Sequence, residues 1–143
     1  MAEHRSSIDI AAPPERVFEY LVTAEGITAW MGDWAQVEPT PGGEFSVNIA
    51  GYGARGIFLE VDRPRRVTVS WGFEGSEELP PGSSTVSFEL SATDGGTRVE
   101  VVHTDLPESA VPGHVDGWDH FVARLALAAT GQRLPPDTWT PSQ

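Results

Sequence analysis

The chain has 143 residues, no cysteine and a formal net charge of −12, and 39% of its residues are hydrophobic. This length predicts one domain with a buried core, and the lack of cysteine excludes disulfides, thiolate metal sites and a cysteine nucleophile. All nine basic residues are arginines scattered along the chain, so we expect no nucleic-acid partner, because phosphate binding needs clustered cations. The N-terminus lacks an apolar signal segment and no run could span a membrane, which favours a cytoplasmic protein without membrane contact.

The first third of the chain predicts one strand and two helices. A short strand is expected over residues 6–12 and a helix over residues 13–22, with proline in the first turn, where a missing N–H costs nothing. Thr23 is suited to cap a second short helix that reaches Trp30.

Alternation of apolar and polar residues then predicts an antiparallel sheet with one buried face. Turn sequences such as "AGYGARG", "DRPR", "PPGSS" and "DGG" separate the strands. The parity places Glu60, Glu89, Glu100 and Phe58 on the outer face. The expected strands cover residues 44–50, 56–62, 66–73, 85–92 and 98–104. The residues expected inward are Phe45, Val47, Ile49, Ile57, Leu59, Val61, Val67, Val69, Trp71, Phe73, Val86, Phe88, Leu90, Val99, Val101 and His103.

The register of the last hairpin depends on its turn. A turn at Asp94–Gly95 would place Glu89 directly opposite Glu100, which is a repulsive pair. A turn at Gly95–Gly96 would place Glu89 opposite Val102 instead. We therefore predict the Gly95–Gly96 turn.

The last helix is predicted over residues 117–131, with Gly117 at its start. Its apolar stripe is aromatic at the first end, narrows to alanines at the other, and consists of Trp118, Phe121, Val122, Leu125 and Ala129. Such a stripe is typical of a core helix, and a ligand cavity beneath Trp118 is the alternative. The elements together predict one α+β domain over residues 1–131, in which this helix covers the sheet. A proline-rich tail over residues 132–143 follows, and its Trp139 either docks on the domain or frays.

Three of the four histidines lie close together in the sequence. His103 is expected to point inward, His114 to lie in the loop before the helix or at its start, and His120 to point outward. Because the three differ in direction, we expect no metal site, and nothing indicates a cofactor. His103 is either a core-edge histidine or a group that orients a ligand, and the favoured register places it beside Phe88. No inward carboxylate accompanies His103, so no catalytic residue is assigned.

Inward aromatic residues from several segments either fill a core or line a small-molecule pocket. Tyr52, between two glycines, is either an exposed loop residue or a lid over that pocket. The candidate ligand-binding residues are Trp30, Phe45, Tyr52, Leu59, Trp71, Phe73, Phe88, Val101, His103, Trp118, Phe121, Val122 and Leu125.

Five blocks occur in an order and spacing that resemble a known family: "APPERVFEYL", "AWMGDWAQVEPTPGGEF", "LEVDRPRRVTVSWGF", "TRVEVVHTDLP" and "HVDGWDHFVARLALAATG". The sequence resembles the activator of heat shock protein 90 ATPase homologues, a branch of the START-related, birch-pollen-allergen-like (SRPBCC) superfamily. The resemblance runs from about Ile8 to Gly131. It implies a helix-grip fold, in which a curved antiparallel sheet wraps around the C-terminal helix and two short helices close one end. It also implies that the space between helix and sheet holds a small apolar or amphipathic molecule.

Three functions follow from these observations. The first is a non-catalytic or weakly catalytic binder of a small hydrophobic molecule, such as a lipid or polyketide. The second is a cochaperone-like module that stimulates a heat shock protein 90 type ATPase, with the acidic surface and the loop "FEGSEELPPG" as contacts. The third is an enzyme acting on a polyketide-like substrate with His103 as acid or base. The oligomeric state does not follow from the sequence.

Overall fold

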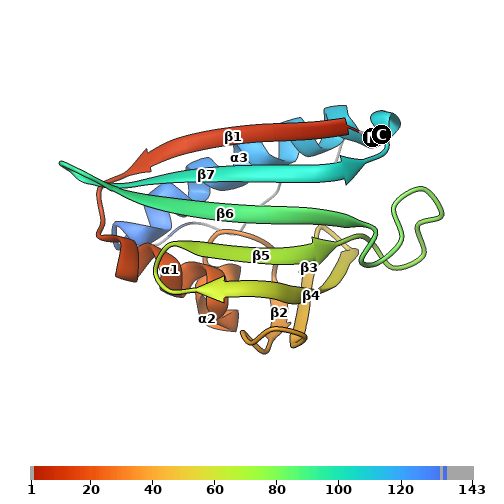
Figure 1. The fold of residues 1–143 in the computed structure, drawn as a ribbon, viewed down its shortest axis with the longest axis horizontal. Coiled ribbons are helices and arrows are strands. Elements are labelled where there is room, and N and C mark those ends of the chain that lie inside the picture. The colour runs from red at the N-terminus through yellow and green to blue at the C-terminus, as the bar shows by residue number, and fades with distance from the viewer. Residues whose placement is uncertain (1, 133, 135–143) are drawn as a thin grey trace.

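In the computed structural model, a seven-stranded antiparallel sheet curves around one long helix (Figure 1). The structure describes residues 2–132 and residue 134, and the predicted tail, including Trp139, otherwise lies outside the described residues. The strand order is β1-β7-β6-β5-β4-β3-β2. The strands are β1 (Ala2–Ile10), β2 (Trp34–Val37), β3 (Glu44–Ile49), β4 (Tyr52–Asp62), β5 (Arg66–Trp71), β6 (Ser84–Thr93) and β7 (Gly96–Leu106). The helices are α1 (Pro14–Val22), α2 (Ala24–Thr28), the 3-10 helix η1 (Glu108–Ala110) and α3 (Val111–Ala129).

The two short helices form where they were predicted, although α2 ends at Thr28 and does not reach Trp30. Pro14 occupies the first turn of α1. The Thr23 side chain accepts a hydrogen bond of 2.9 Å from the Gly26 N–H and caps α2. After α2, the Trp30 indole donates to the Tyr20 carbonyl at 2.8 Å. The Arg124 guanidinium of α3 donates to the Trp30 carbonyl at 3.2 Å, so this corner of the fold is tied to α3.

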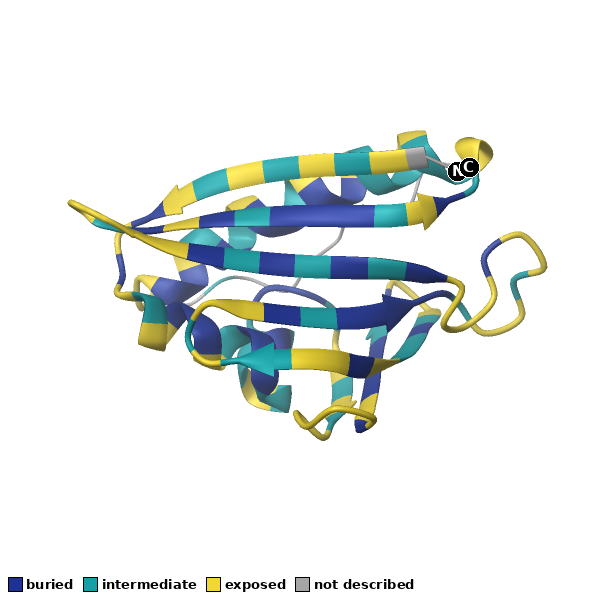
Figure 2. Cartoon of the chain, in the orientation of Figure 1, coloured by how far each residue is buried: buried dark blue, intermediate teal, exposed yellow. Residues whose placement is uncertain are grey.

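Helix α3 crosses the concave face of the sheet, and its predicted apolar stripe is buried (Figures 1 and 2). The predicted start of this helix was wrong, because α3 begins at Val111 and Gly117 lies in its interior. Pro112, in the first turn, is the start signal that the sequence interpretation passed over. Gly113 and Gly117 both lie within the helix, and packing of one helix face outweighs the roughly 1 kcal/mol that each glycine costs.

The predicted inward position of Leu59 was wrong, because β4 does not alternate evenly along its length. A bulge lies between Phe58 and Glu60. Before the bulge the inward positions are Ala54 and Phe58, which are fully buried, whereas Ile57 is 42% and Leu59 45% exposed. Phe58, expected on the outer face, is therefore part of the core. An extra residue at a bulge inverts the parity, and a strict alternation cannot reveal it.

The sheet also extends further than the sequence predicted. Strand β2 was not predicted, and it pairs with β3 from Trp34 to Val37. Much of the segment "AGYGARG" belongs to β4 rather than to a turn. The turn itself is confined to Ala50 and Gly51, whose φ angles of 51° and 85° lie in the left-handed region.

The predicted turn of the β6–β7 hairpin was wrong as well. The two residues between the paired strands are Asp94–Gly95, and Glu89 lies opposite Glu100. Each carboxylate has an arginine from the neighbouring strand on the same face. The distance from Arg66 Nη2 to Glu89 Oε1 is 3.1 Å, and that from Arg5 Nη1 to Glu100 Oε2 is 3.7 Å. These cations offset the repulsion that the hairpin sequence alone suggested.

Buried and less buried residues alternate along β6, as Figure 2 shows, which is the pattern of a strand with one face in the core. Phe88, Val99 and Val101 are buried as expected, and Glu60 is exposed on the outer face. At the far end of α3, Ala128 and Ala129 are buried and Leu127 is 42% exposed. None of the described helices is long and apolar enough to cross a membrane.

The small residues at the end of α3 predict a specific sensitivity to overpacking. Ala129 has no exposed surface, whereas Ala123 on the same helix is exposed. Ala129→Leu should lower the free energy of unfolding by about 1–3 kcal/mol, because the core there is closely packed. Ala123→Leu should change it by no more than about 0.5 kcal/mol. Urea unfolding of both variants measures this, and equal stabilities would contradict close packing at Ala129.

Candidate functional site

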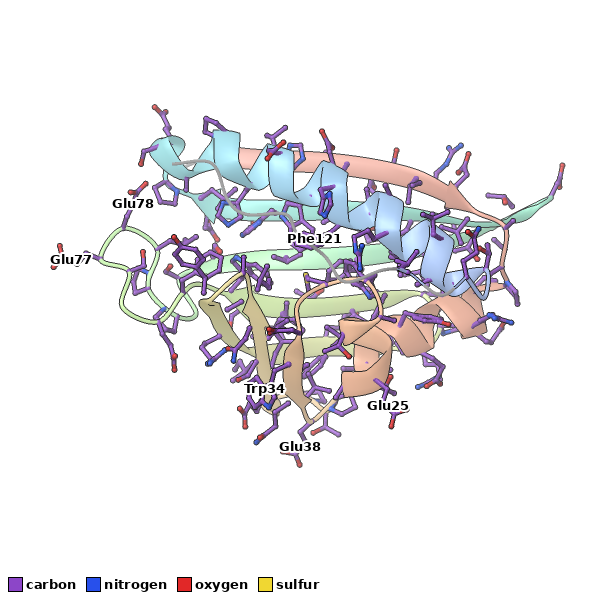
Figure 3. The ribbon with its side chains drawn as sticks, turned by 180° about the vertical axis from the view of Figure 1, so that it is seen from behind. Glu25, Trp34, Glu38, Glu77, Glu78 and Phe121 are labelled. Carbon is purple, nitrogen blue, oxygen red and sulfur yellow. The ribbon has the colours of Figure 1, made fainter. Side chains whose placement is uncertain are left out.

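A cavity of about 420 Å³ lies between the first half of α3 and the end of the sheet where β5 leaves it. Residues 72–83, which connect β5 to β6, form one side of this cavity, and η1 with the start of α3 forms another. Figure 3 shows this connecting segment beside the start of α3, with Phe121 on the face of α3 that meets the sheet. The lining residues are Met31, Ile49, Tyr52, Trp71, Phe73, Glu74, Gly75, Ser76, Glu78, Leu79, Ser109, Ala110, Gly113, His114, Gly117, Trp118 and Phe121.

Aromatic rings form the inner wall of the cavity. The ring centroids of Trp71 and Trp118 are 5.4 Å apart, and those of Trp71 and Phe73 are 5.7 Å apart. Tyr52 extends the wall towards the surface, with its ring 6.3 Å from that of Phe73. Distances of this size are those of favourable aromatic pairs, so the rings hold one another in place.

Behind this wall, His103 joins α3 to the sheet. Its Nδ1 accepts a hydrogen bond of 3.0 Å from the Trp118 indole N–H. Its Nε2 lies 2.8 Å from Ser84 Oγ, which itself donates to the Trp71 carbonyl at 2.8 Å. Because the indole can only donate, Nδ1 carries no proton, and Nε2 must donate to Ser84. His103 is therefore neutral, with its proton on Nε2.

His114 forms a second histidine–tryptophan pair at the surface of the cavity. The Trp71 indole N–H donates to His114 Nε2 at 3.3 Å, and His114 Nδ1 lies 2.9 Å from the Ala110 carbonyl. A carbonyl can only accept, so Nδ1 carries the proton and His114 is also neutral. The centroids of His103 and His114 are 4.9 Å apart. At this distance, a positive charge on one ring would disfavour protonation of the other ring.

The pKa values of both histidines follow from this environment. Burial, and to a smaller extent His114 and His4, lower the pKa of His103 to about 2. Burial also lowers the pKa of His114, and the hydrogen bond to Ala110 opposes part of this change. Both rings therefore stay neutral at physiological pH.

The predicted set of ligand-binding residues divides into three groups in the structure. The residues that line the cavity are Tyr52, Trp71, Phe73, Trp118 and Phe121. The residues in the core outside the cavity are Trp30, Phe45, Phe88, Val101, Val122 and Leu125, and His103 lies behind the wall, fully buried. Leu59 is exposed on the opposite side of the sheet. With the Asp94–Gly95 turn, the residue opposite His103 is Val86, not Phe88.

Several cavity residues were missed from the sequence. The charged lining residues Glu74 and Glu78 belong to a segment that was read as a loop for protein contacts. Ser109 and Gly113 lie where no helix was expected, because the start of α3 was placed too late. The proline of the first turn was the available signal for this part of the site.

The expectation that the three histidines diverge was wrong for two of them. His103 and His114 meet face to edge because α3 starts early enough to bring His114 over β7. His120 lies one turn and a half further along α3, beside Phe121. Within the residues that the structure describes, no group of three or more histidine, aspartate or glutamate side chains is placed to hold a metal ion.

The neutral histidines predict a pH-dependent stability. Between about pH 6.5 and the folded-state pKa of His103, which is about 2, His103 binds a proton in the unfolded chain but stays neutral in the folded chain. The free energy of unfolding should therefore fall as the pH is lowered, by up to about 1.4 kcal/mol per pH unit for this group. His103→Gln should flatten the slope between about pH 6.5 and 4.5.

Urea unfolding at a series of pH values measures the slope. His120→Gln is the control, since it is the same substitution at a histidine of α3 that lies outside the two histidine–tryptophan pairs. A slope for His103→Gln equal to that of the unaltered chain would contradict a neutral, buried His103.

Comparison with solved structures identifies the same architecture in several bacterial proteins. An AHSA1-like protein from Rhizobium etli is 40% identical, with a TM-score of 0.76 over 99% of this chain and 90% of that chain. The Aha1 dimer from Colwellia psychrerythraea is 21% identical, with a TM-score of 0.78 over 90% of this chain and 96% of that one. CalU16 from Micromonospora echinospora is 27% identical, with a TM-score of 0.74 over 95% of this chain and 68% of that chain. A search of the curated proteins found no match.

A comparison with family profiles gives a match over most of the chain. The profile described as Activator of Hsp90 ATPase homolog 1-like protein covers residues 11–129, which include α1, the whole of strands β2 to β7 and α3. The curved sheet around a long C-terminal helix is the helix-grip fold that the sequence blocks implied. The chain belongs to the Activator of Hsp90 ATPase homolog 1-like protein family.

Proposed function

We propose that this protein binds a small, mainly apolar molecule in the cavity beside α3, without catalysing a reaction on it. The cavity volume of about 420 Å³ falls within the range of roughly 300–1,000 Å³ that is usual for small-molecule sites. The family and the solved relatives support the fold in which such a cavity forms. The ligand-binding role itself rests on the cavity.

The observation that carries the proposal is the pairing of polar atoms within the wall. The indole N–H of Trp71 is bonded to His114, and that of Trp118 to His103. These donors are satisfied by the protein, so the rings offer their apolar faces to the cavity. An apolar surface that is preorganised and open to solvent favours a hydrophobic ligand over water.

The two other functions receive less support from this geometry. His103 is fully buried with both nitrogens bonded, so it does not face a substrate as the enzyme hypothesis required. His114 faces the cavity, but both of its nitrogens are bonded as well. The cochaperone-like role stays a prediction. Phe58, which was expected on the outer face, is buried and so offers no apolar contact to a protein partner.

A neutral probe tests the proposal directly. The uncharged dye N-phenyl-1-naphthylamine should bind with one-to-one saturation and should quench tryptophan fluorescence, because Trp71 and Trp118 line the cavity. Gly113→Leu should weaken the affinity for the dye by at least about tenfold, which corresponds to about 1.4 kcal/mol of binding free energy. Gly113 lines the cavity, and a Cβ placed on it meets open space, so a leucine there would fill the site.

The matched control is Ala123→Leu, which adds a leucine to an exposed position of the same helix. It should leave dye binding unchanged. Gly113→Leu should not lower the melting temperature, because replacing a helical glycine favours the helix. Dye binding that is equally strong in both variants would place the probe elsewhere and overturn the proposal.

A further inference from the structure

The charge around the cavity is acidic. Its charged lining residues, within the part of the chain that the structure describes, are Glu74 and Glu78. Arg55 lies outside the lining and pairs with Glu74, with its Nε 3.2 Å from Oε1. Glu78 forms no such ion pair with a described residue, and its carboxylate accepts a hydrogen bond from the Ser109 hydroxyl. Glu78 is therefore the main uncompensated charge at the cavity.

The position of Glu78 also sets the charge that a ligand encounters at the start of α3. The first turn of a helix attracts negative charge, because its N–H groups point outward. In this structure the Glu78 side chain points towards that end, where it contacts Ser109 of η1 (Figure 3). A ligand carboxylate entering here would meet the carboxylate of Glu78. The same position favours a cation.

The aromatic wall favours a cation for an independent reason. The faces of indole, phenol and phenyl rings carry partial negative charge and attract ammonium groups. Trp71, Trp118, Phe73 and Tyr52 all line the cavity, and the indole edges of Trp71 and Trp118 are occupied by the two histidines. His114, the basic side chain of the lining, is neutral and adds no opposing charge.

We propose that the ligand is an amphipathic amine, whose apolar body lies against Trp71 and Trp118 and whose protonated nitrogen lies at Glu78. This inference rests on the proposed function and adds the chemical class of the ligand. It also predicts that fatty acids and other apolar carboxylates are disfavoured, although their apolar parts would fit the same wall.

Three probes with one bicyclic body and different charges test the inference by isothermal titration calorimetry. They are 2-(2-naphthyl)ethylamine, 2-(2-naphthyl)ethanol and 2-naphthylacetate at pH 7 and low salt. The amine should bind most tightly and the carboxylate most weakly, with a ratio of at least about tenfold between them. Two unit charges 4 Å apart in water already change affinity by about fivefold, and the two probes differ in the sign of the charge.

Glu78→Gln is the informative variant, and Glu77→Gln is its matched control. Glu77 is adjacent in the sequence, does not line the cavity and points away from the molecule in Figure 3. Both substitutions remove one negative charge from the chain, so they separate a local effect from the general attraction of an acidic protein. Glu78→Gln should lower the affinity for the amine by about fivefold and leave the affinity for the alcohol unchanged. Glu77→Gln should change neither affinity by more than about twofold.

The neutral alcohol separates the two proposals. If the alcohol binds but the amine and the carboxylate bind equally, the amine inference is overturned and the apolar site stands. Equal losses of amine binding in Glu77→Gln and Glu78→Gln would also overturn the inference, because they would show a general charge effect. If none of the three probes binds, both the apolar site and the amine inference fail.

Discussion

The two hydrogen bonds that Trp71 and Trp118 donate to neutral histidines are the constraint on which the rest of the site depends. One of them crosses from α3 to β7, and the other crosses from β5 back to α3. Each indole needs an acceptor because it is shielded from water, and an imidazole is an acceptor only while one of its nitrogens carries no proton. The pairs therefore fix the separation of helix and sheet, the orientation of the indole faces and the neutrality of the histidines together. Ser84 extends the network to the Trp71 carbonyl, so a single hydrogen-bond network joins β5, β6, β7 and α3.

The cavity lies at the end of α3 where this network is found. At the C-terminal end of α3 the buried side chains are alanines and the helix packs closely on the core. Near the start of α3, the paired tryptophan and histidine rings form a rigid wall of the cavity. A wall whose polar atoms bond to one another does not need water or a ligand for its hydrogen bonds, so it can enclose an apolar space without collapse. The residues from 72 to 83 and η1 form the sides of that space and carry the acidic groups. The tryptophans of the wall come from β5 and α3, whereas the acidic groups come from the connecting segment, so the two can be altered separately.

Much of the fold could be predicted from the sequence, because the buried positions repeat with the period of their element. The stripe of α3 and the inward face of β5 to β7 appear in this way. The capping role of Thr23 follows instead from its residue type, because a threonine hydroxyl accepts a hydrogen bond from the first turn of a helix. Failures occurred where a local interruption or a distant partner decides the outcome. The bulge beside Leu59 inverts one strand, and Arg5 and Arg66 from neighbouring strands make the Glu89–Glu100 pair acceptable. The part of the site formed by η1 and the first turns of α3 was missed because residues such as Gly113 and His114 precede the expected start of that helix. No periodicity marks the residues of a connecting segment such as Glu78.

The tautomers of the two histidines test the account most directly, and ¹⁵N NMR of the side chains reports them. The hydrogen bonds require opposite patterns, with the proton of His103 on Nε2 and that of His114 on Nδ1. His103 should also keep its neutral signals throughout a titration from about pH 8 to 5, since burial holds its pKa near 2. The same tautomer in both rings, or protonation of His103 near its ordinary pKa of about 6.5, would contradict the paired network.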